Sequence, residues 1–453
     1  MRCAFLAGLF AVAASAGGAA RADDLPALGE EKSYAVPAAE IAGFDFLLNR
    51  ADRRVYGHDY AVSPSSIRRN LHGPWIVDND PYSVNQLLHP YQGSIYHGFA
   101  RSAGLGFWPS LGYTFAGSLG WEIAGETTPP SKNDQVASGI AGGFLGESLF
   151  RMSNLVLERG YGGAWRELAA AAISPSTGFN RIAFGERFRQ VLDSKDAAYY
   201  SRVQVGASGA LHQAEGPAEV KRNELLADYS IDYGLPGKPG YRYDRPWDYF
   251  AFNATASSAN AVENLSTRGL LIGSRTAAGE RYRGIWGLYG SYDYLAPQLF
   301  RISSTALSLG STGELHLNDE VAVQGTFLAG VGYAGVGTLH GTRDTDYHYG
   351  ATPQGLLALR VIFGNRSSID LAARDYFVSR VAGAGTGGHD NIARIDLTWT
   401  IRVHREHRIA IKYLWSRRDA TFLTLGDLSQ SRATIGIYYA YLARESLGRV
   451  DWR

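Results

Sequence analysis

The side chains that could do chemistry are concentrated between residues 89 and 151. This segment combines histidines, carboxylates, arginines and a serine at helix-like spacings. The candidate site residues are His89, Tyr91, His97, Arg101, Glu122, Glu126, Ser131, Asp134, Glu147 and Arg151. Imidazole and carboxylate groups can bind a metal ion or exchange protons, and a serine can attack a carbonyl group when a histidine activates it. The segment is therefore the first candidate for a ligand site or a catalytic site.

Several of these groups also have structural interpretations. Ser131 precedes Asp134 by three residues, which is the spacing of a helix capping box. Glu147 and Arg151 are four residues apart, which favours an ion pair on one helix face. No histidine lies near Ser131 in sequence, and the spacings match no compact metal or cofactor motif. We favour a satisfied structural network, and a ligand or metal site and a hydrolytic site stay open as alternatives.

The elements that carry these residues are predicted to be helices with small residues at their contacts. Small residues recur every four positions at Gly112, Ala116, Gly120 and Ala124, and again at Gly142 and Gly146. Such spacing lets helix backbones approach closely. Charged groups at close contacts must be paired or bound to a ligand, because an unpaired buried charge is costly. The alternative to such pairing is a site of His and carboxylate groups, either a metal site or an acid/base pair, on which His89, His97, Glu122, Glu126, Asp134 and Glu147 converge.

The periodicity of apolar residues divides the chain into five segments. Residues 1–22 are predicted to be a signal peptide, because Arg2 precedes a short apolar stretch and Ala20-Arg21-Ala22 forms a cleavage site. Residues 23–88 contain scattered prolines and are predicted to be irregular. The remaining segments are a helical region at 89–198, a β-barrel at 199–443 and a polar C-terminal tail at 444–453.

The barrel prediction rests on strict alternation of apolar and polar residues. Residues 393–404 are the clearest case, with Trp399 on the apolar face and Arg402 on the polar face. About twelve such segments of about ten residues follow one another, long enough to cross a bilayer as tilted strands. The range is ten to fourteen, because residues 300–316 could be a helix or a loop. We predict a mainly β fold, a transmembrane antiparallel β-barrel, preceded by helices that plug or cap it.

The polar face of these segments carries charges of both signs. The predicted lumen charges are Asp228, Asp232, Arg360, Arg374, Arg394, Asp396 and Arg402. A dry core would not hold so many charges, whereas a wet lumen would. We interpret them as a ladder of ion pairs, with a constriction that selects anionic or zwitterionic solutes as the alternative.

The helical segment resembles a known protein family. The motifs that carry the resemblance are His89-Pro90-Tyr91, Tyr96-His97 with Arg101, Trp121-Glu122, Glu126, Pro130-Ser131, Asp134, and Gly146-Glu147 with Arg151. Together they resemble a Gram-negative envelope protein family of unknown function. The resemblance implies an outer-membrane β-barrel with an N-terminal helical part, and it carries over no activity.

The composition and the predicted location limit the classes of function that the protein can have. The chain of 453 residues has 44 Lys+Arg and 43 Asp+Glu, so it lacks the basic surface of a nucleic-acid binder. We expect an integral protein of the cell outer membrane, in contact with lipids, that binds, scaffolds or passes a small or lipidic ligand without a cofactor. The alternatives are a membrane-embedded hydrolase of phospholipid or lipopolysaccharide, and a substrate-specific channel.

Overall fold

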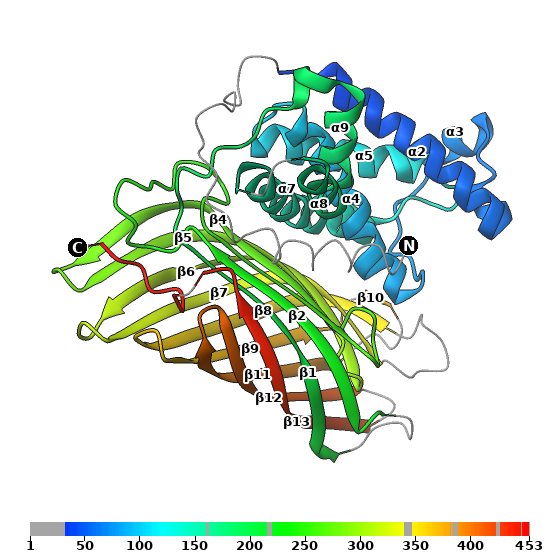
Figure 1. Cartoon of the computed structure of the whole chain (residues 1–453). Coiled ribbons are helices and arrows are strands. Elements are labelled where there is room, and N and C mark those ends of the chain that lie inside the picture. The colour runs from blue at the N-terminus through cyan, green and yellow to red at the C-terminus, as the bar shows by residue number, and fades with distance from the viewer. Residues whose placement is uncertain are drawn as a thin grey trace. The chain divides into compact units, whose positions relative to one another are not determined.

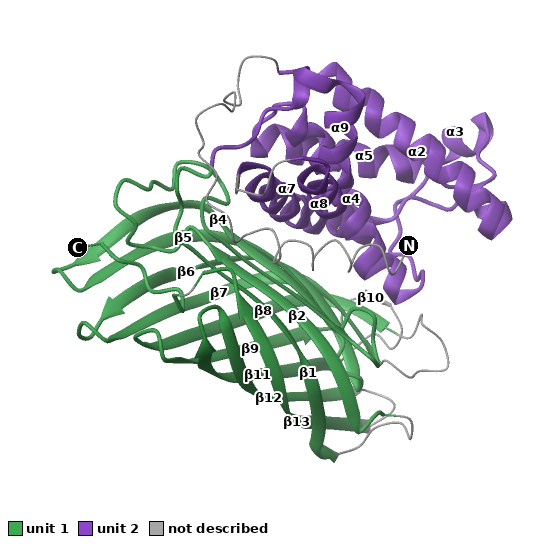
Figure 2. Ribbon diagram, in the orientation of Figure 1, with its two compact units in different colours: residues 1–17, 194–453 green, residues 18–193 purple. Residues whose placement is uncertain are grey.

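The computed structural model describes residues 32–159, 163–214, 220–338, 347–380, 382–383, 388–422, 426–444 and 446–452. The chain divides into a helical unit that ends at Asp193 and a strand unit that continues from Ser194 (Figure 2). The predicted signal peptide at 1–22 lies outside the described residues. The first strand begins at Tyr199, where the sequence predicts the start of the barrel.

The helical unit begins earlier than the sequence predicts. Its helices are α2 (Ala35–Tyr56), η1 (Gly57–Tyr60), α3 (Pro64–His72), η2 (Val84–Leu88), α4 (His89–Ser102), α5 (Phe107–Ala124), α6 (Lys132–Asp134), η3 (Gln135–Ala141), α7 (Gly142–Arg159), α8 (Ala164–Ile173), α9 (Pro175–Ala183) and η4 (Gly185–Phe188). The irregular segment predicted at 23–88 is thus wrong where α2 and α3 lie. Pro37 falls in the first turn of α2 and Pro64 begins α3, and in both places the missing N–H of proline is not needed.

Helices α4 and α7 pack closely through glycines. A Cβ atom added to Gly142 would lie 2.6 Å from the Cα of Gly93, and one added to Gly146 would lie 2.7 Å from the Cβ of His97. Real Cβ atoms do not approach so closely, so a larger residue would push the two helices apart. The small-residue contact predicted at Gly142 and Gly146 is confirmed.

The other predicted ladder is not a helix contact. Gly112 and the three small residues that follow it at four-residue intervals lie on the exposed face of α5. Helix α5 buries Thr114, Gly117 and Trp121 instead. Among the helices that the structure describes, none is long and apolar enough to cross a membrane.

The second unit is a single closed sheet. Its strands are β1 (Tyr199–Ala214), β2 (Asn223–Tyr233), β3 (Phe250–Ser257), β4 (Asn264–Ala278), β5 (Tyr282–Leu295), β6 (Phe300–His316), β7 (Val321–Thr338), β8 (Tyr347–Phe363), β9 (Ser367–Ser379), β10 (Ala382–Gly383), β11 (Gly388–His404), β12 (His407–Phe422) and β13 (Gly426–Leu442). Every described pairing is antiparallel, and β1 pairs with both β2 and β13 (Figure 1). Apart from the two-residue β10, the twelve described strands form an antiparallel closed β-barrel, as predicted, and residues 300–316 form β6.

The two faces of the barrel differ in chemistry. In β11, Trp399 and Val403 are exposed, whereas Arg394, Thr398 and Thr400 are buried. The same alternation in the other strands turns large apolar side chains outward. Exposed examples are Val205, Leu225, Ile272, Trp286, Leu309, Phe327, Leu357, Ile369, Ile409 and Ile437. Polar residues therefore point into the lumen, as the alternating pattern predicts.

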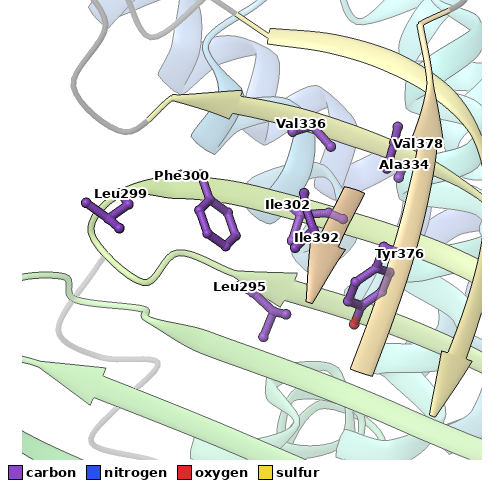
Figure 3. Packing of buried hydrophobic residues seen from close by; sticks show 9 residues of the cluster. All are labelled: Leu295, Leu299, Phe300, Ile302, Ala334, Val336, Tyr376, Val378 and Ile392. Atoms are coloured by element: carbon purple, nitrogen blue, oxygen red, sulfur yellow. The ribbon is translucent and has the colours of Figure 1, made fainter. Parts of the chain in front are cut away.

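Apolar side chains from opposite walls fill one end of the lumen. The cluster contains Leu295, Leu299, Phe300, Ile302, Ala334, Val336, Tyr376, Val378 and Ile392 (Figure 3). The Tyr376 hydroxyl donates to Asp293 Oδ2 across 3.0 Å. Tyr376 belongs to β9 and Asp293 to β5, which are not neighbours in the ring. The contact therefore crosses the lumen.

The C-terminal tail covers the other end of the lumen. The sequence predicts a polar tail at 444–453, yet Leu447 and Val450 are buried. They join an apolar cluster with Tyr200, Leu235, Ile362 and Leu442. The Val450 N–H donates to Glu314 Oε1 across 3.1 Å, and the Trp452 ring stacks on His316 with centroids 3.7 Å apart. The tail is therefore an ordered part of the barrel.

Candidate functional site

A buried ion cluster surrounds Glu147 on α7. Glu147 accepts hydrogen bonds from Arg101 Nε at 2.7 Å and Arg151 Nε at 2.8 Å, and its Oε2 lies 3.1 Å from His97 Nε2. Burial disfavours its ionisation, but Arg101, His97 and Arg151 hold its pKa well below the ordinary value of 4.5. Burial lowers the pKa of His97. Glu147 is therefore an ionised carboxylate between two arginines.

This cluster is best explained as structural. The predicted ion pair between Glu147 and Arg151 is present, and the Arg101 guanidinium also lies 4.6 Å from the centre of the Phe150 ring. The Glu147 side chain is fully buried. Its contacts hold α4 against α7, because Arg101 belongs to α4 and Arg151 to α7.

A second cluster contains carboxyl groups that face one another. Glu122 Oε2 accepts the Ser131 N–H at 2.7 Å, and Glu126 Oε1 accepts the Trp121 Nε1–H at 2.6 Å. Burial, with the neighbouring carboxyl groups adding to it, raises the pKa of Glu122 to about 9 and the pKa of Glu126 to about 7. Glu122 is therefore a protonated carboxyl group at neutral pH.

His89 and Asp134 extend this cluster. His89 Nε2 lies 3.6 Å from Asp134 Oδ2, and His89 Nδ1 lies 3.3 Å from the Ser138 hydroxyl. Burial raises the pKa of Asp134 well above its ordinary value and lowers the pKa of His89 to about 4. Asn133 Nδ2 bridges the carboxyl groups of Asp134 and Asp78 at 3.1 and 2.7 Å. The result is a neutral histidine beside a proton-rich set of acids.

The order Ser138–His89–Asp134 has the residue types of a hydrolase triad, but it is closed to a substrate. All three side chains are buried, and it is Nδ1, not Nε2, that faces the serine. A Cβ atom on Gly93 would lie only 1.9 Å from the Ser138 carbonyl oxygen. A substrate could reach Ser138 only if α4 and η3 separated.

Two π-helical segments position this pair. The segment η2 ends immediately before His89, and η3 begins immediately after Asp134. Ser131 accepts the Asp134 N–H at 3.2 Å and so caps the short helix α6, as its spacing predicts. The second half of the predicted capping box is wrong, because the Ser131 N–H is donated to Glu122. π-helical turns are rare, and they shift side chains out of the register of an α-helix. His89 and Asp134 thus lie at the borders of two turns that change the helical register.

The site residues named from the sequence do not converge on one site but fall into two clusters. His97, Arg101, Glu147 and Arg151 form one, and His89, Glu122, Glu126, Ser131 and Asp134 form the other. Tyr91 packs beside the apolar side chains of Ile95 and Phe99. Asp78, Asp80 and Asn133 were not predicted. In the described part of the chain, no group of three or more histidine, cysteine or acidic residues is placed to hold a metal ion.

The barrel contains a separate charged site. A cavity of about 170 Å³ lies in the lumen. Its charged lining residues are Arg202, Asp228, Asp232, Arg268, Arg360, Asp370, Arg374, Asp396 and Lys412. Arg360 Nε lies 2.5 Å from Asp370 Oδ1, and Arg360 Nη2 lies 3.2 Å from Asp232 Oδ2. Lys412 Nζ lies 3.7 Å from Asp228 Oδ2. Charges of both signs thus line one space.

Most of the predicted lumen charges meet around this cavity. Asp228, Asp232, Arg360, Arg374 and Asp396 line it. Arg394 is buried beside it, and its Nε lies 3.2 Å from Asp396 Oδ2. Arg402 follows the inward register of β11 but is not among the lining residues. Asp370 and Lys412, which the alternation also places on the inward face, line the cavity too, whereas Arg202 and Arg268 were missed as site residues.

One family model matches part of the chain. Residues 74–176 match a model described as a domain of unknown function (DUF3943). This confirms the resemblance to an uncharacterised family for the segment that holds both helical clusters. No curated protein matches the chain.

Solved outer-membrane barrels align with the chain at low similarity. The outer-membrane channel DcaP of Acinetobacter baumannii is 7% identical with a TM-score of 0.26. The aligned region covers 55% of this chain and 97% of the DcaP chain. The NanC porin has the same identity and TM-score, with coverage of 53% and 98%. The translocator domain of autotransporter NalP from Neisseria meningitidis is 13% identical with a TM-score of 0.24, with coverage of 59% and 97%. At these TM-scores the likeness carries no argument about function.

Proposed function

We propose that the chain is an integral outer-membrane protein that binds a small polar ligand inside a closed barrel. This proposal rests on one observation: the strands turn apolar side chains outward and charged side chains into the lumen. Trp286, Phe327 and Ile437 are 58%, 60% and 67% exposed on the outer face, while charged residues line the lumen. An apolar surface of this extent is unfavourable in water, and a bilayer would cover it.

The two ends of the lumen favour binding of a ligand inside the barrel over free diffusion of solutes through it. The cluster around Tyr376 fills one end, and the buried Leu447 and Val450 cover the other. We propose that these two clusters, which belong to the barrel itself, close the lumen without a helical plug. We propose a non-enzymatic role in which the helical unit is a separate folded module, held together by its two polar clusters.

Fractionation and conductance test this proposal. The full-length protein should partition with outer membranes, need detergent for extraction, and migrate faster on a gel before boiling than after. In planar bilayers it should lack the steady large conductance of an open pore. Extraction without detergent would refute the membrane location, and a permanently open channel would refute the closed lumen.

A further inference from the structure

We propose that the lumen cavity binds a small oxyanion, a carboxylate or phosphate group, between Arg268 of β4 and Arg374 of β9. This inference rests on the proposed function and extends it by naming the class of ligand. Guanidinium groups suit such a ligand, because carboxylates and phosphates accept two parallel hydrogen bonds from arginine.

Arg268 lines the cavity without a counterion. In the described residues its side chain forms no ion pair, and its Nε has no hydrogen-bond partner. The neighbouring cations differ, since Arg360 contacts two carboxylates and Lys412 contacts one. Arg268 is partly buried, and its unpaired positive charge would attract an anion that enters the cavity.

Arg374 approaches the cavity from the facing wall. It is more than nine-tenths buried, its Nη1 lies 3.2 Å from Asp396 Oδ2, and its Nε has no partner. Arg202 is equally buried and also has an unpartnered Nε. Strands β4 and β9 are five strands apart in the ring, and Arg268 and Arg374 together line both this cavity and a smaller adjoining one. Free donor groups therefore meet in one space from two sides.

The charges of the lining favour an anion of low charge. The cavity has five cationic side chains, Arg202, Arg268, Arg360, Arg374 and Lys412, against four carboxylates, Asp228, Asp232, Asp370 and Asp396. The lining of this cavity thus has one more cationic than anionic side chain, while Asp293 of the adjoining cavity accepts a hydrogen bond from the Tyr376 hydroxyl. Hydroxyl groups from Ser266, Thr312, Thr326 and Thr398 also line the space and can hydrogen-bond a hydroxylated ligand. At about 170 Å³ the cavity suits a small acid and not a drug-sized molecule.

Calorimetric titration of the full-length protein in detergent, with inorganic phosphate and separately with acetate, tests this site. The wild type should bind at least one of the two anions saturably. Arg268→Ala should weaken that binding at least tenfold. Arg275→Ala removes an exposed arginine of the same strand that is not a lining residue, so it should change the affinity by less than twofold. Asp396→Asn should tighten binding, because it frees Arg374 from its carboxylate partner.

Folding controls separate ligand binding from a structural role. Without added anion, Arg268→Ala should be as heat-resistant as the wild type, because the substitution breaks no ion pair. Marked loss of heat resistance, or unchanged binding in this variant, would overturn the anion site. A wild type that shows heat-modifiable mobility but binds neither anion would refute this inference alone. A wild type without heat-modifiable mobility would refute the proposed function beneath it.

Native mass spectrometry distinguishes the sources of a phosphate. Saturable uptake of inorganic phosphate would identify a free ion. A lipid mass retained by the wild type and lost from Arg268→Ala would identify a lipid headgroup. Both outcomes support the oxyanion site, and a retained lipid that is unaffected by Arg268→Ala would contradict it.

Discussion

Glu122→Gln should remove a large part of the pH dependence of the helical unit's stability. Burial, together with the charges of Glu126 and other acids, raises the pKa of Glu122 from 4.5 to about 9. Between these values the folded state binds more protons at this site than the unfolded state does. The free energy of unfolding therefore falls as the pH rises, and this contribution is fully present only below about pH 4.5.

The magnitude follows from the proton that is lost. One group contributes at most about 1.4 kcal/mol per pH unit, so the wild type should lose up to about 4 kcal/mol through Glu122 between about pH 5.5 and about pH 8.5. Glutamine imitates the protonated acid, and its carbonyl oxygen can still accept the Ser131 N–H. The variant should therefore match the wild type at acidic pH and exceed its stability at alkaline pH.

Urea unfolding of the full-length protein in detergent, followed by circular dichroism at 222 nm, measures this effect. A gel-mobility assay confirms that the barrel stays folded during the titration. Glu167→Gln is the matched control, because its hydrogen bond with Arg181 lowers the pKa of Glu167. That control should shift the stability equally across this pH range. Parallel pH profiles for wild type and Glu122→Gln would show that Glu122 is ionised and would refute the proton-rich cluster.

The remaining predictions concern the ion cluster, the outer face and the tail. Glu147→Gln leaves Arg101 and Arg151 buried without a full negative charge, so the same urea titration should show a loss of about 3–5 kcal/mol; unchanged stability would contradict the ionised carboxylate. Ile437→Arg should destabilise the barrel in lipid vesicles by up to about 2–4 kcal/mol, since the side chain faces outward; a neutral effect would argue against a lipid-covered face. Removal of residues 444–453 should increase conductance in planar bilayers, because the tail covers one end of the lumen; a silent bilayer would mean that other segments suffice.

The barrel could be predicted because its signal repeats in many strands. An apolar outer face and a polar inner face require alternation, and residues 393–402 of β11 show it clearly. Strand β6 was harder to predict, because its inward positions are mostly small residues such as Ser304 and Ser308. Their hydropathy differs little from that of the outward positions. Helix α2 was missed since Pro37 was interpreted as a break, although a proline in the first turn is compatible with a helix.

The helical site could be predicted only in part. Spacing along one helix identified the pair Glu147–Arg151 and the cap at Ser131, because both interactions are local. Which helices would meet depended on Gly93 facing Gly142, a contact between distant segments. The π-helical turns also shifted His89 and Asp134 out of α-helical register, so helix-face arithmetic could not place them.

The final residues also join parts of the ring that are far apart along the chain. The first and last strands, β1 and β13, meet at a seam. From there the chain passes Gly448, whose added Cβ would lie 3.1 Å from Tyr200 of β1, and reaches Glu314 of β6 through Val450. The tail residues thus contact the first strand of the ring and also a strand far from the seam. A variant without these contacts would keep every strand of the ring but would lose a brace that spans it.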